Sequence, residues 1–424
     1  MTTVATKAAL PVATRPSRLG SDFKRIFTAT AVSNFGDGIR EAALPLLAAT
    51  MTRDPLLVAG VVAAGRAPWL LLTLVSGAIV DRVNRRTLMW RVDVFRTLVM
   101  VVLAASVLSG AVNLPLLYVC AFLLGAAETL FDNAAHAILP SLVGRENLER
   151  ANGRLESAMM VSNDFAGPPM GALLFAVAVA VPLAVDAASF ALASVLVFSV
   201  RARPVAPVIL EHRSLRADIA EGVRWLGRNP VLRSLSLTAA GVNLVVHGTW
   251  AIFVLYSLQV VGTGRIGFGI LVSAFALGGV LGGLFAPRIA VQGPGRAITT
   301  AILLAAAAEL VMGVFSHALV ISGMLVVLGF AGAVWNVVTT SLRQRLVPDR
   351  LLGRVNSAHR MLSWGSIPMG ALLGGLIARS FGLRAPFLFA AVILVGLAVV
   401  TRGLARRLVA SAESGDTVID LQNA

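Results

Sequence analysis

Gly77-Ala-Ile-Val-Asp81-Arg82-Val-Asn84-Arg85-Arg86 is a charged turn that interrupts a strongly apolar region of the chain. Residues 56–80 before it are almost entirely apolar, and residues 88–107 after it are apolar apart from three charged side chains. A helix needs about 20 mostly apolar residues to cross a lipid bilayer. The turn is therefore predicted to join two membrane-spanning helices.

Composition predicts that the rest of the chain also lies in a membrane. Hydrophobic residues make up 57% of the 424 residues and charged residues 13%, about half the charged share of an ordinary globular protein. A β-barrel would show alternating apolar and polar residues, whereas this sequence has long continuous apolar runs. We predict an all-α membrane protein with twelve transmembrane helices. The predicted spans are 25–50, 56–80, 88–110, 114–140, 154–177, 182–201, 232–260, 266–290, 297–316, 318–342, 356–379 and 384–403.

The net charge of +15 is explained by membrane topology, because the basic residues gather in the short loops between predicted spans. When basic residues near the span ends are counted with the adjoining loops, 29 Lys and Arg residues fall on one side, four on the other, and three (Arg40, Arg66 and Arg96) inside helices. Basic loops remain in the cytoplasm. We therefore expect a multi-pass protein of the plasma membrane with both termini cytoplasmic and no nucleic-acid partner. The use of 34 Arg against two Lys favours a bacterial source.

The two halves of the chain repeat each other. Residues 125–132 align with residues 329–336 at an offset of 204 positions, and Pro169-Met-Gly-Ala-Leu-Leu174 recurs as Pro368-Met-Gly-Ala-Leu-Leu373. A repeat with the same topology predicts two six-helix bundles related by an axis along the membrane normal. The expected parts are an N-terminal tail (1–24), a first bundle (25–201), a linker with an amphipathic helix (202–231), a second bundle (232–403) and a C-terminal tail (404–424).

The charged turn resembles the signature loop between helices two and three of the major facilitator superfamily of secondary transporters. Its pattern is Gly-x-x-x-Asp-Arg-x-x-Arg-Arg, with Asn84 where that family usually has Gly, and Asn also tolerates a left-handed backbone. The resemblance implies the major facilitator fold, with a substrate site near the midplane between the bundles. It also implies a cytoplasmic gating loop with a charged latch, formed by Gly77, Asp81, Arg82, Arg85 and Arg86.

Span five contains a second motif. Its residues Gly167, Pro168 and Gly171 resemble the antiporter motif of exporters in this superfamily. Proline removes a helix hydrogen-bond donor, and glycine allows two helices to approach closely. The motif predicts a kinked, tightly packed helix that can rock during transport. A packing kink without directional meaning is the alternative, because Pro368-Met-Gly370 repeats it in the other half.

Charged side chains inside the predicted spans are further candidates, because each costs several kcal/mol in the membrane unless it is paired or faces water. A carboxyl group in a cavity can bind a proton from one side and release it to the other. The candidates for proton coupling are Asp37, Glu41, Glu128, Asp132 and Asp164, with Arg40 and Arg66 as charge partners. A structural ion pair is the alternative for each acid, and we expect Asp93 and Arg96, near the cytoplasmic end of their span, to be mainly structural.

The second half contributes a sparse set of polar and aromatic side chains among aliphatic ones. Such a lining suits a broad amphipathic ligand better than a sugar, which needs many hydrogen bonds. The candidate residues of the substrate cavity are Asn243, His247, Trp250, Glu309, Trp335 and Asn336. Core packing is the alternative for each of them.

Shorter motifs between residues 20 and 405, among them Phe35-Gly-Asp37-Gly and Glu221-Gly-Val-Arg-Trp225, resemble the branch that holds macrolide-efflux-like and siderophore exporters. This resemblance implies a secondary active transporter, namely a proton-coupled efflux antiporter of small amphipathic drug-like, antibiotic-like or siderophore-like compounds that works by alternating access. An importer or a lysolipid or solute transporter of the same fold is the closest alternative.

An intramembrane enzyme that uses Asp132 and His136 is the alternative of a different class, but no third ligand or nucleophile has a recognisable spacing. The Gly-x-x-x-x-Gly-Lys-Ser/Thr loop that binds nucleotides does not occur in the sequence. We therefore expect no enzyme activity, cofactor or metal. The expected partners are a small-molecule substrate, protons and the lipid bilayer, and the expected oligomeric state is a monomer.

Overall fold

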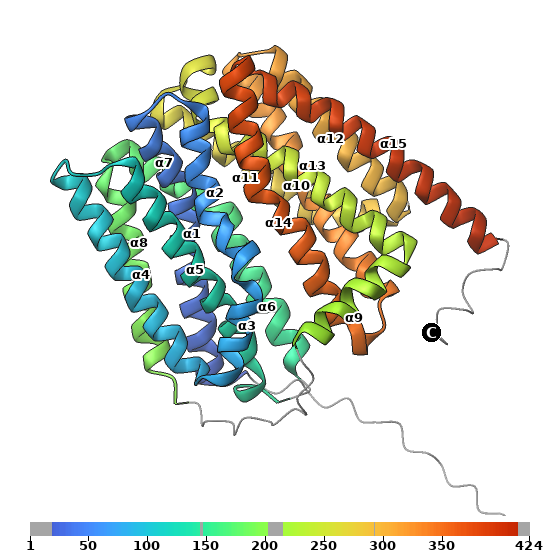
Figure 1. Cartoon of the computed structure of the whole chain (residues 1–424), viewed down its shortest axis with the longest axis horizontal. Helices are drawn as coiled ribbons and strands as arrows, with labels where there is room; N and C mark the ends of the chain where they lie inside the picture. Colours follow the sequence, from blue (N-terminus) through green and yellow to red (C-terminus); the bar gives the residue numbers. More distant parts are fainter. Residues whose placement is uncertain (1–18, 145–146, 202–214, 292, 414–424) are drawn as a thin grey trace, which may run out of the picture.

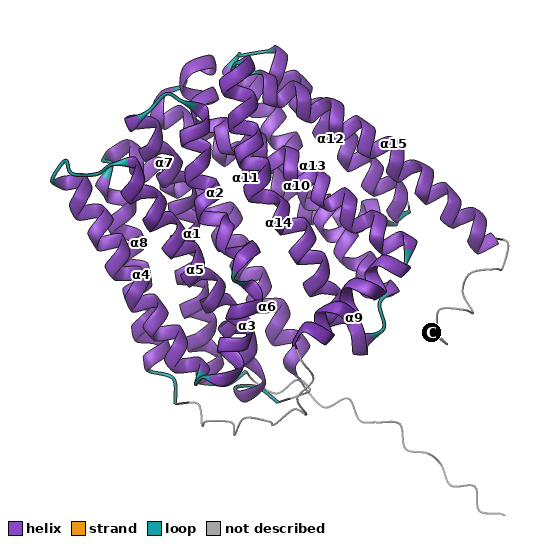
Figure 2. Ribbon diagram, in the orientation of Figure 1, coloured by secondary structure: helices purple, strands orange, loops and turns teal. Residues whose placement is uncertain are grey.

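The computed structural model describes residues 19–144, 147–201, 215–291 and 293–413. Within these ranges every regular element is a helix (Figure 2). The predicted tails lie largely outside the described residues, as does the first part of the predicted linker.

The first six predicted spans correspond to the helices that precede residue 200 (Figure 1). Span two is divided at Leu72 into α2 and α3, and span five is divided by a π-helical turn, η3. The elements are α1 (Ser21–Met51), α2 (Pro55–Leu71), α3 (Thr73–Arg82), α4 (Arg85–Leu108), α5 (Leu114–Ile138), α6 (Leu148–Met160), η3 (Val161–Ala166), α7 (Gly167–Val177) and α8 (Ala180–Phe198).

The remaining six predicted spans correspond to the helices that follow the linker. Each has one main helix, and the first continues into a short π-helical turn, η4. The linker helix α9 (Leu215–Arg228) precedes them. The elements are α10 (Pro230–Tyr256), η4 (Ser257–Val261), α11 (Gly264–Ala290), α12 (Pro294–Val314), α13 (Ala318–Leu346), α14 (Asp349–Phe381) and α15 (Ala385–Glu413).

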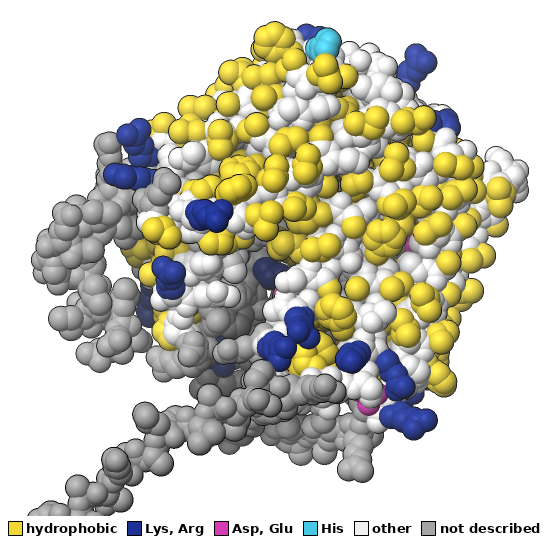
Figure 3. All heavy atoms as spheres, turned by 180° about the vertical axis from the view of Figure 1, so that it is seen from behind, with side chains coloured by type: hydrophobic (Ala, Val, Ile, Leu, Met, Phe, Trp, Pro, Cys, Tyr) yellow, Lys and Arg dark blue, Asp and Glu magenta, His cyan; other side chains and the backbone are white. Residues whose placement is uncertain are grey.

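Eight helices of the described chain are long and apolar enough, by length and composition, to cross a membrane. The first half supplies two of them, α5 and α8, and the second half supplies six. The other helices of the first half are not among the eight. Span two is interrupted, and α1 and α4 carry several charged residues. Hydrophobic side chains cover much of the outer face in Figure 3, as expected for a surface in contact with lipid.

The structure corrects the expected role of Asn84. This residue has an extended backbone, with φ of −65°, and no described non-glycine residue has a positive φ. Its side chain instead caps the N-terminus of α4, because Asn84 Oδ1 accepts a hydrogen bond from the Thr87 backbone N–H at 3.1 Å. Asn is among the residues preferred at this capping position.

Glycines bring α1 and α7 together backbone against backbone. A methyl group on Gly171 would lie 2.2 Å from the Ile39 carbonyl oxygen, and one on Gly167 would lie 2.5 Å from the Gly38 Cα atom. The second half repeats this packing, because a methyl group on Gly370 would lie 2.1 Å from the Leu244 carbonyl oxygen. The contact therefore requires glycine.

The two groups of helices contact each other mainly through α2 with α14 and α7 with α11. The contact between α2 and α14 runs from Ala59 and Gly375 to Trp69 and Trp364, whose ring centroids are 5.1 Å apart. The next helix after α2, α3, packs on α5, and α6 packs on α1, so both make these contacts within the first half.

The main contacts between the halves therefore lie along α2 with α14 and α7 with α11, whereas α3 and α6 pack chiefly on helices of the first half. We call the end of the molecule that carries Arg82, Arg85 and Arg86, where α3 is followed by α4, the basic side.

Candidate functional site

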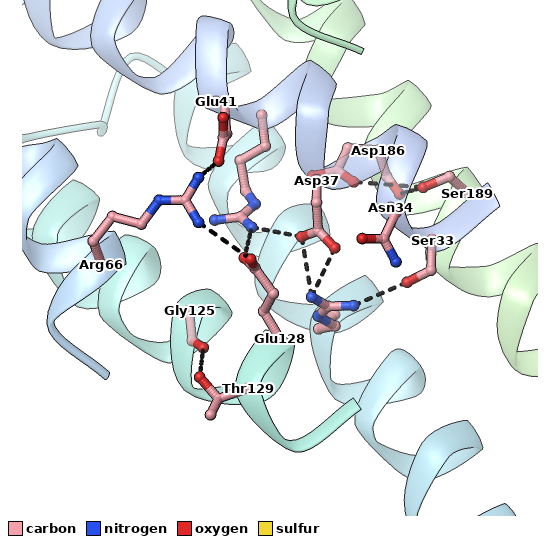
Figure 4. A network of polar contacts seen from close by, with 12 residues as sticks. Ser33, Asn34, Asp37, Glu41, Arg66, Gly125, Glu128, Thr129, Asp186 and Ser189 are labelled. Carbon is pink, nitrogen blue, oxygen red and sulfur yellow. Dashed lines mark hydrogen bonds and ion pairs between the residues drawn. The ribbon is translucent and has the colours of Figure 1, made fainter. Parts of the chain in front are cut away.

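A network of ion pairs lies inside the first half, between α1, α4 and α5 (Figure 4). At its centre is Asp37 of α1, which accepts hydrogen bonds from Arg96 Nη2 at 2.9 and 3.0 Å and from Arg40 Nη2 at 2.5 Å. All three side chains are buried. Arg96, expected near the cytoplasmic end of its span, lies at this centre, with its guanidinium 4.5 Å from the ring centroid of Phe190.

The network continues from Arg40 towards the gap between the halves. Glu128 Oε2 lies 2.7 Å from Arg40 Nη2, and Glu128 Oε1 lies 3.5 Å from Arg66 Nη1. Arg66 also pairs with Glu41. The Arg66 and Glu41 side chains are 23% and 26% exposed, so the network leads from a dry interior to a partly open end.

Two further acids adjoin the buried end. Asp93 lies 3.4 Å from Arg96 and 3.3 Å from the Ser33 hydroxyl, which donates to it. Asp186 is fully buried in α8, where the Ser189 hydroxyl is 3.5 Å from its Oδ1. Asp93 Oδ2 and Asp186 Oδ2 are buried without a hydrogen-bond partner.

Asp132 lies one helical turn beyond Glu128 in α5. It is 7% exposed, and its Oδ1 is buried without a hydrogen-bond partner. His136, which the enzyme hypothesis paired with it, lies instead 3.4 Å from Glu156 Oε1. Asp164 is exposed in η3, and its charge interacts with that of Arg66. Within the described ranges no group of three or more His, Cys, Asp or Glu residues could hold a metal.

The span-five motif contacts the turn of α1 that carries Asp37 and Arg40. Gly167 and Gly171 pack against Gly38 and Ile39, which lie between those two charged residues. Pro168 stands at the start of α7, directly after the π-helical turn. π-Helical turns inside helices are frequent at functional sites. The motif therefore positions the buried network.

The gating-loop residues lie on the basic side. Arg85 Nη1 donates to the Ala137 carbonyl at 2.9 Å, and Arg86 donates to the Phe198 carbonyl. Both acceptors are at helix C-termini, which attract cations. Arg82 is exposed, and the Asp81 side chain lies outside the described residues. Arg85 and Arg86 thus tie α4 to α5 and α8, within the first half.

The candidate cavity residues of the second half belong to three helices, α10, α12 and α13. Asn243 donates to the Ser363 carbonyl at 2.8 Å, and Trp250 stacks on Phe253 with ring centroids 5.3 Å apart. Glu309 is fully buried between α10 and α12, where its Oε1 accepts from the Thr249 hydroxyl at 3.0 Å, so it lines no open cavity in this structure. His247 and Trp335 are half-buried, and Asn336 is exposed.

Sequence reasoning missed three residues at the meeting point of the halves. Arg360 is exposed in α14, and its guanidinium lies 4.4 Å from the ring centroid of Trp364 and 5.8 Å from that of Trp69. The sequence signal for this site was an arginine and a tryptophan inside the predicted span 356–379. The count of basic residues on the two sides of the membrane placed Arg360 with the basic loops instead.

Solved structures identify the fold. A bacterial homologue of the human lysosomal transporter Spinster aligns with a TM-score of 0.72 and 14% identity over 91% of this chain and 96% of that chain. A bacterial homologue of the iron transporter ferroportin, in an inward-facing state, aligns with a TM-score of 0.68 and 16% identity over 90% of this chain and all of that chain. The fold is that of the major facilitator transporters.

The family model described as transmembrane secretion effector matches residues 16–418, and the chain belongs to this branch of the major facilitator transporters. Among its relatives is the multidrug efflux pump Tap of Mycolicibacterium fortuitum, 28% identical over 90% of this chain and 95% of that protein. Tap of Mycobacterium tuberculosis is 27% identical over 93% of this chain and 96% of that protein. These relatives and structural neighbours are transporters, not enzymes.

Proposed function

We propose that this chain is a proton-coupled antiporter that exports small amphipathic compounds across the bacterial plasma membrane. The observation that carries the proposal is the imbalance of charge inside the first half, where carboxyl groups outnumber the arginines that neutralise them. The efflux pumps named Tap support the direction of transport, since they match nearly the whole chain.

The imbalance follows from the buried network and its neighbours. The carboxyl groups are those of Asp37, Glu41, Asp93, Glu128, Asp132 and Asp186, and the guanidinium groups are those of Arg40, Arg66 and Arg96. A carboxylate that is buried without a counter-ion costs several kcal/mol. The excess acids are therefore best accommodated in their protonated form.

Asp132 is our candidate for the proton carrier. It is buried, it contacts no arginine within salt-bridge distance among the described residues, and its Oδ1 has no hydrogen-bond partner. Asp37 and Glu128, by contrast, are each held by two arginines. An acid that is free of ion pairs can gain and lose a proton without breaking the network.

The packing of the halves supports alternating access. We propose that their contact through α2, α14, α7 and α11 closes one side of the molecule and that the helices open towards the basic side. The positive-inside rule makes the basic side cytoplasmic, with both termini there, so we assign this structure to a cytoplasm-facing state. We further propose that the transporter acts as a monomer, since one chain supplies both halves of the fold.

Transport in inverted membrane vesicles tests the direction and the coupling. A panel of fluorescent amphipathic compounds of negative, neutral and positive charge is offered to vesicles whose interior is acidified by respiration. We expect accumulation of at least one compound, abolished by an uncoupler. Accumulation only in right-side-out vesicles would show import, and accumulation that ignores the uncoupler would contradict proton coupling.

A further inference from the structure

Two arginines of the second half have unused hydrogen-bonding capacity. Arg343, near the end of α13, donates from Nη2 to the Thr340 hydroxyl at 3.3 Å, while its Nε and Nη1 are buried without a partner. Arg360 makes no hydrogen bond or ion pair among the described residues. The two positive charges are close enough to interact. Unfilled guanidinium donors beside a second cation are suited to bind an anion.

An aromatic surface adjoins this pair of arginines. The Arg360 guanidinium lies over the ring of Trp364, which is 38% exposed, so part of the indole is accessible. Trp69 of the other half meets Trp364 edge to face, at an interplanar angle of 66°. Leu70 packs against Gly365 beside them. The aromatic pair therefore lies where the two halves begin to separate.

We propose that Arg343, Arg360 and Trp364 form a subsite for the anionic aromatic end of a transported compound. The guanidinium groups bind carboxylate or sulfonate oxygens, and the indole of Trp364 stacks on the ring of the ligand. That the ligand is then exported rests on the proposed function. The binding step itself requires no proton gradient, so it can be tested separately.

The charge of Arg360 also interacts with that of Asp132 across the gap. Arg360 could therefore serve as the counter-ion of Asp132 in another conformation instead of binding a ligand. The two roles predict different selectivity. A counter-ion affects the binding of every ligand through the conformation of the protein, whereas a subsite distinguishes anionic from neutral ligands.

Calorimetric titration of the purified full-length chain in lipid nanodiscs tests the subsite with three probes. Naphthalene-2-sulfonate is an aromatic anion, naphthalene-2-sulfonamide is its neutral counterpart, and octane-1-sulfonate is an anion without a ring. We expect the aromatic anion to bind about tenfold more tightly than either of the others, since it alone satisfies both the arginines and the indole.

Substitutions then assign the preference to residues. Arg343→Gln and Arg360→Gln are each expected to weaken binding of naphthalene-2-sulfonate about tenfold while leaving the sulfonamide unchanged. Trp364→Leu is expected to abolish the preference for naphthalene over octane. Arg345→Gln is the matched control, because Arg345 is exposed on the same helix as Arg343 and should change nothing.

Equal binding of naphthalene-2-sulfonate and its sulfonamide by the unaltered chain would overturn the subsite, and this comparison needs no variant. If Arg360→Gln weakened the binding of naphthalene-2-sulfonate and of its sulfonamide equally, and adding Asp132→Asn restored the binding of both, the subsite would be overturned in favour of the counter-ion role. Selective anion binding by a chain that fails to accumulate any compound in vesicles would refute the proposed function and leave the subsite intact.

Discussion

Arg96 Nη2 of α4 lies 2.9 Å from Asp37 Oδ2 of α1, and the two side chains are 0% and 1% exposed. The turn of α1 that carries Asp37 is also packed backbone to backbone against α7 through Gly38 and Gly167. One turn of one helix is therefore fixed on one side by charge and on the other by glycine packing. We therefore expect any movement of α7 to displace the buried ion pairs as well.

Asp37→Asn is expected to destabilise the protein, because it removes the buried carboxylate that Arg40 and Arg96 share. Breaking a buried pair by removing one partner typically costs about 3–5 kcal/mol. Thermal unfolding of the purified protein measures the effect, and transport should be lost as well. Asp22→Asn, which removes a partly exposed pair with Arg25, is the control. An unchanged midpoint in Asp37→Asn would show that the network does not stabilise the fold.

Gly171→Ala should force α1 and α7 apart, because the added methyl group would overlap the Ile39 carbonyl oxygen. Overpacking of this kind costs about 1–3 kcal/mol, and the displacement of Asp37 should reduce transport. Gly153→Ala in α6 is the control, since a methyl group there meets nothing within 4 Å and should be neutral or stabilising by roughly 0.5–1 kcal/mol. Normal stability and transport in Gly171→Ala would rule out this positioning role.

Gly279→Val should disfavour the cytoplasm-facing state. A methyl group on Gly279 would lie 1.9 Å from Phe165 Cε1, so the branched side chain would separate η3 from α11 where the halves meet. Spin labels at Gly153 and Arg345, on the basic side of each half, are expected to show a shift to shorter distances, with Cys120 replaced by Ala. Phe165→Ala should reverse the shift, and Gly283→Ala, with open space around it, should not cause one. Unaltered distances between the spin labels in Gly279→Val would contradict the assignment of this structure to a cytoplasm-facing state.

The helical spans could be predicted from sequence because the bilayer fixes the length of an apolar helix. Each predicted span coincides within a few residues with one helix or with one divided helix, although some helices, such as α14, extend further than predicted. A kink in span five was predicted from its proline and glycines, but the break inside span two and the π-helical turn of span five were not. The π-helical turn at 161–166 depends on close contacts of Gly167 with Gly38 and of Phe165 with Gly279, which belong to other helices.

The candidate site was only partly predictable for the same reason. The spacing of Asp37 and Glu41 identified a charged helix face, but the two side chains bind different arginines, Arg96 and Arg66. Arg96 seemed peripheral in sequence, because its depth depends on how α4 packs against α1 and α8. Arg360 was counted as a loop residue, since its place between two tryptophans follows from the contact of the halves.

We propose that Asp132 exchanges a proton for substrate while the ion-pair network stays intact. Proteoliposomes containing Asp132→Asn test this role, by comparing accumulation driven by an acidic interior with substrate exchange at equal pH. We predict that the variant retains exchange and normal thermal stability, since Asp132 forms no ion pair with any described residue, but accumulates nothing. Full proton-driven accumulation by Asp132→Asn would show that Asp132 does not carry the proton.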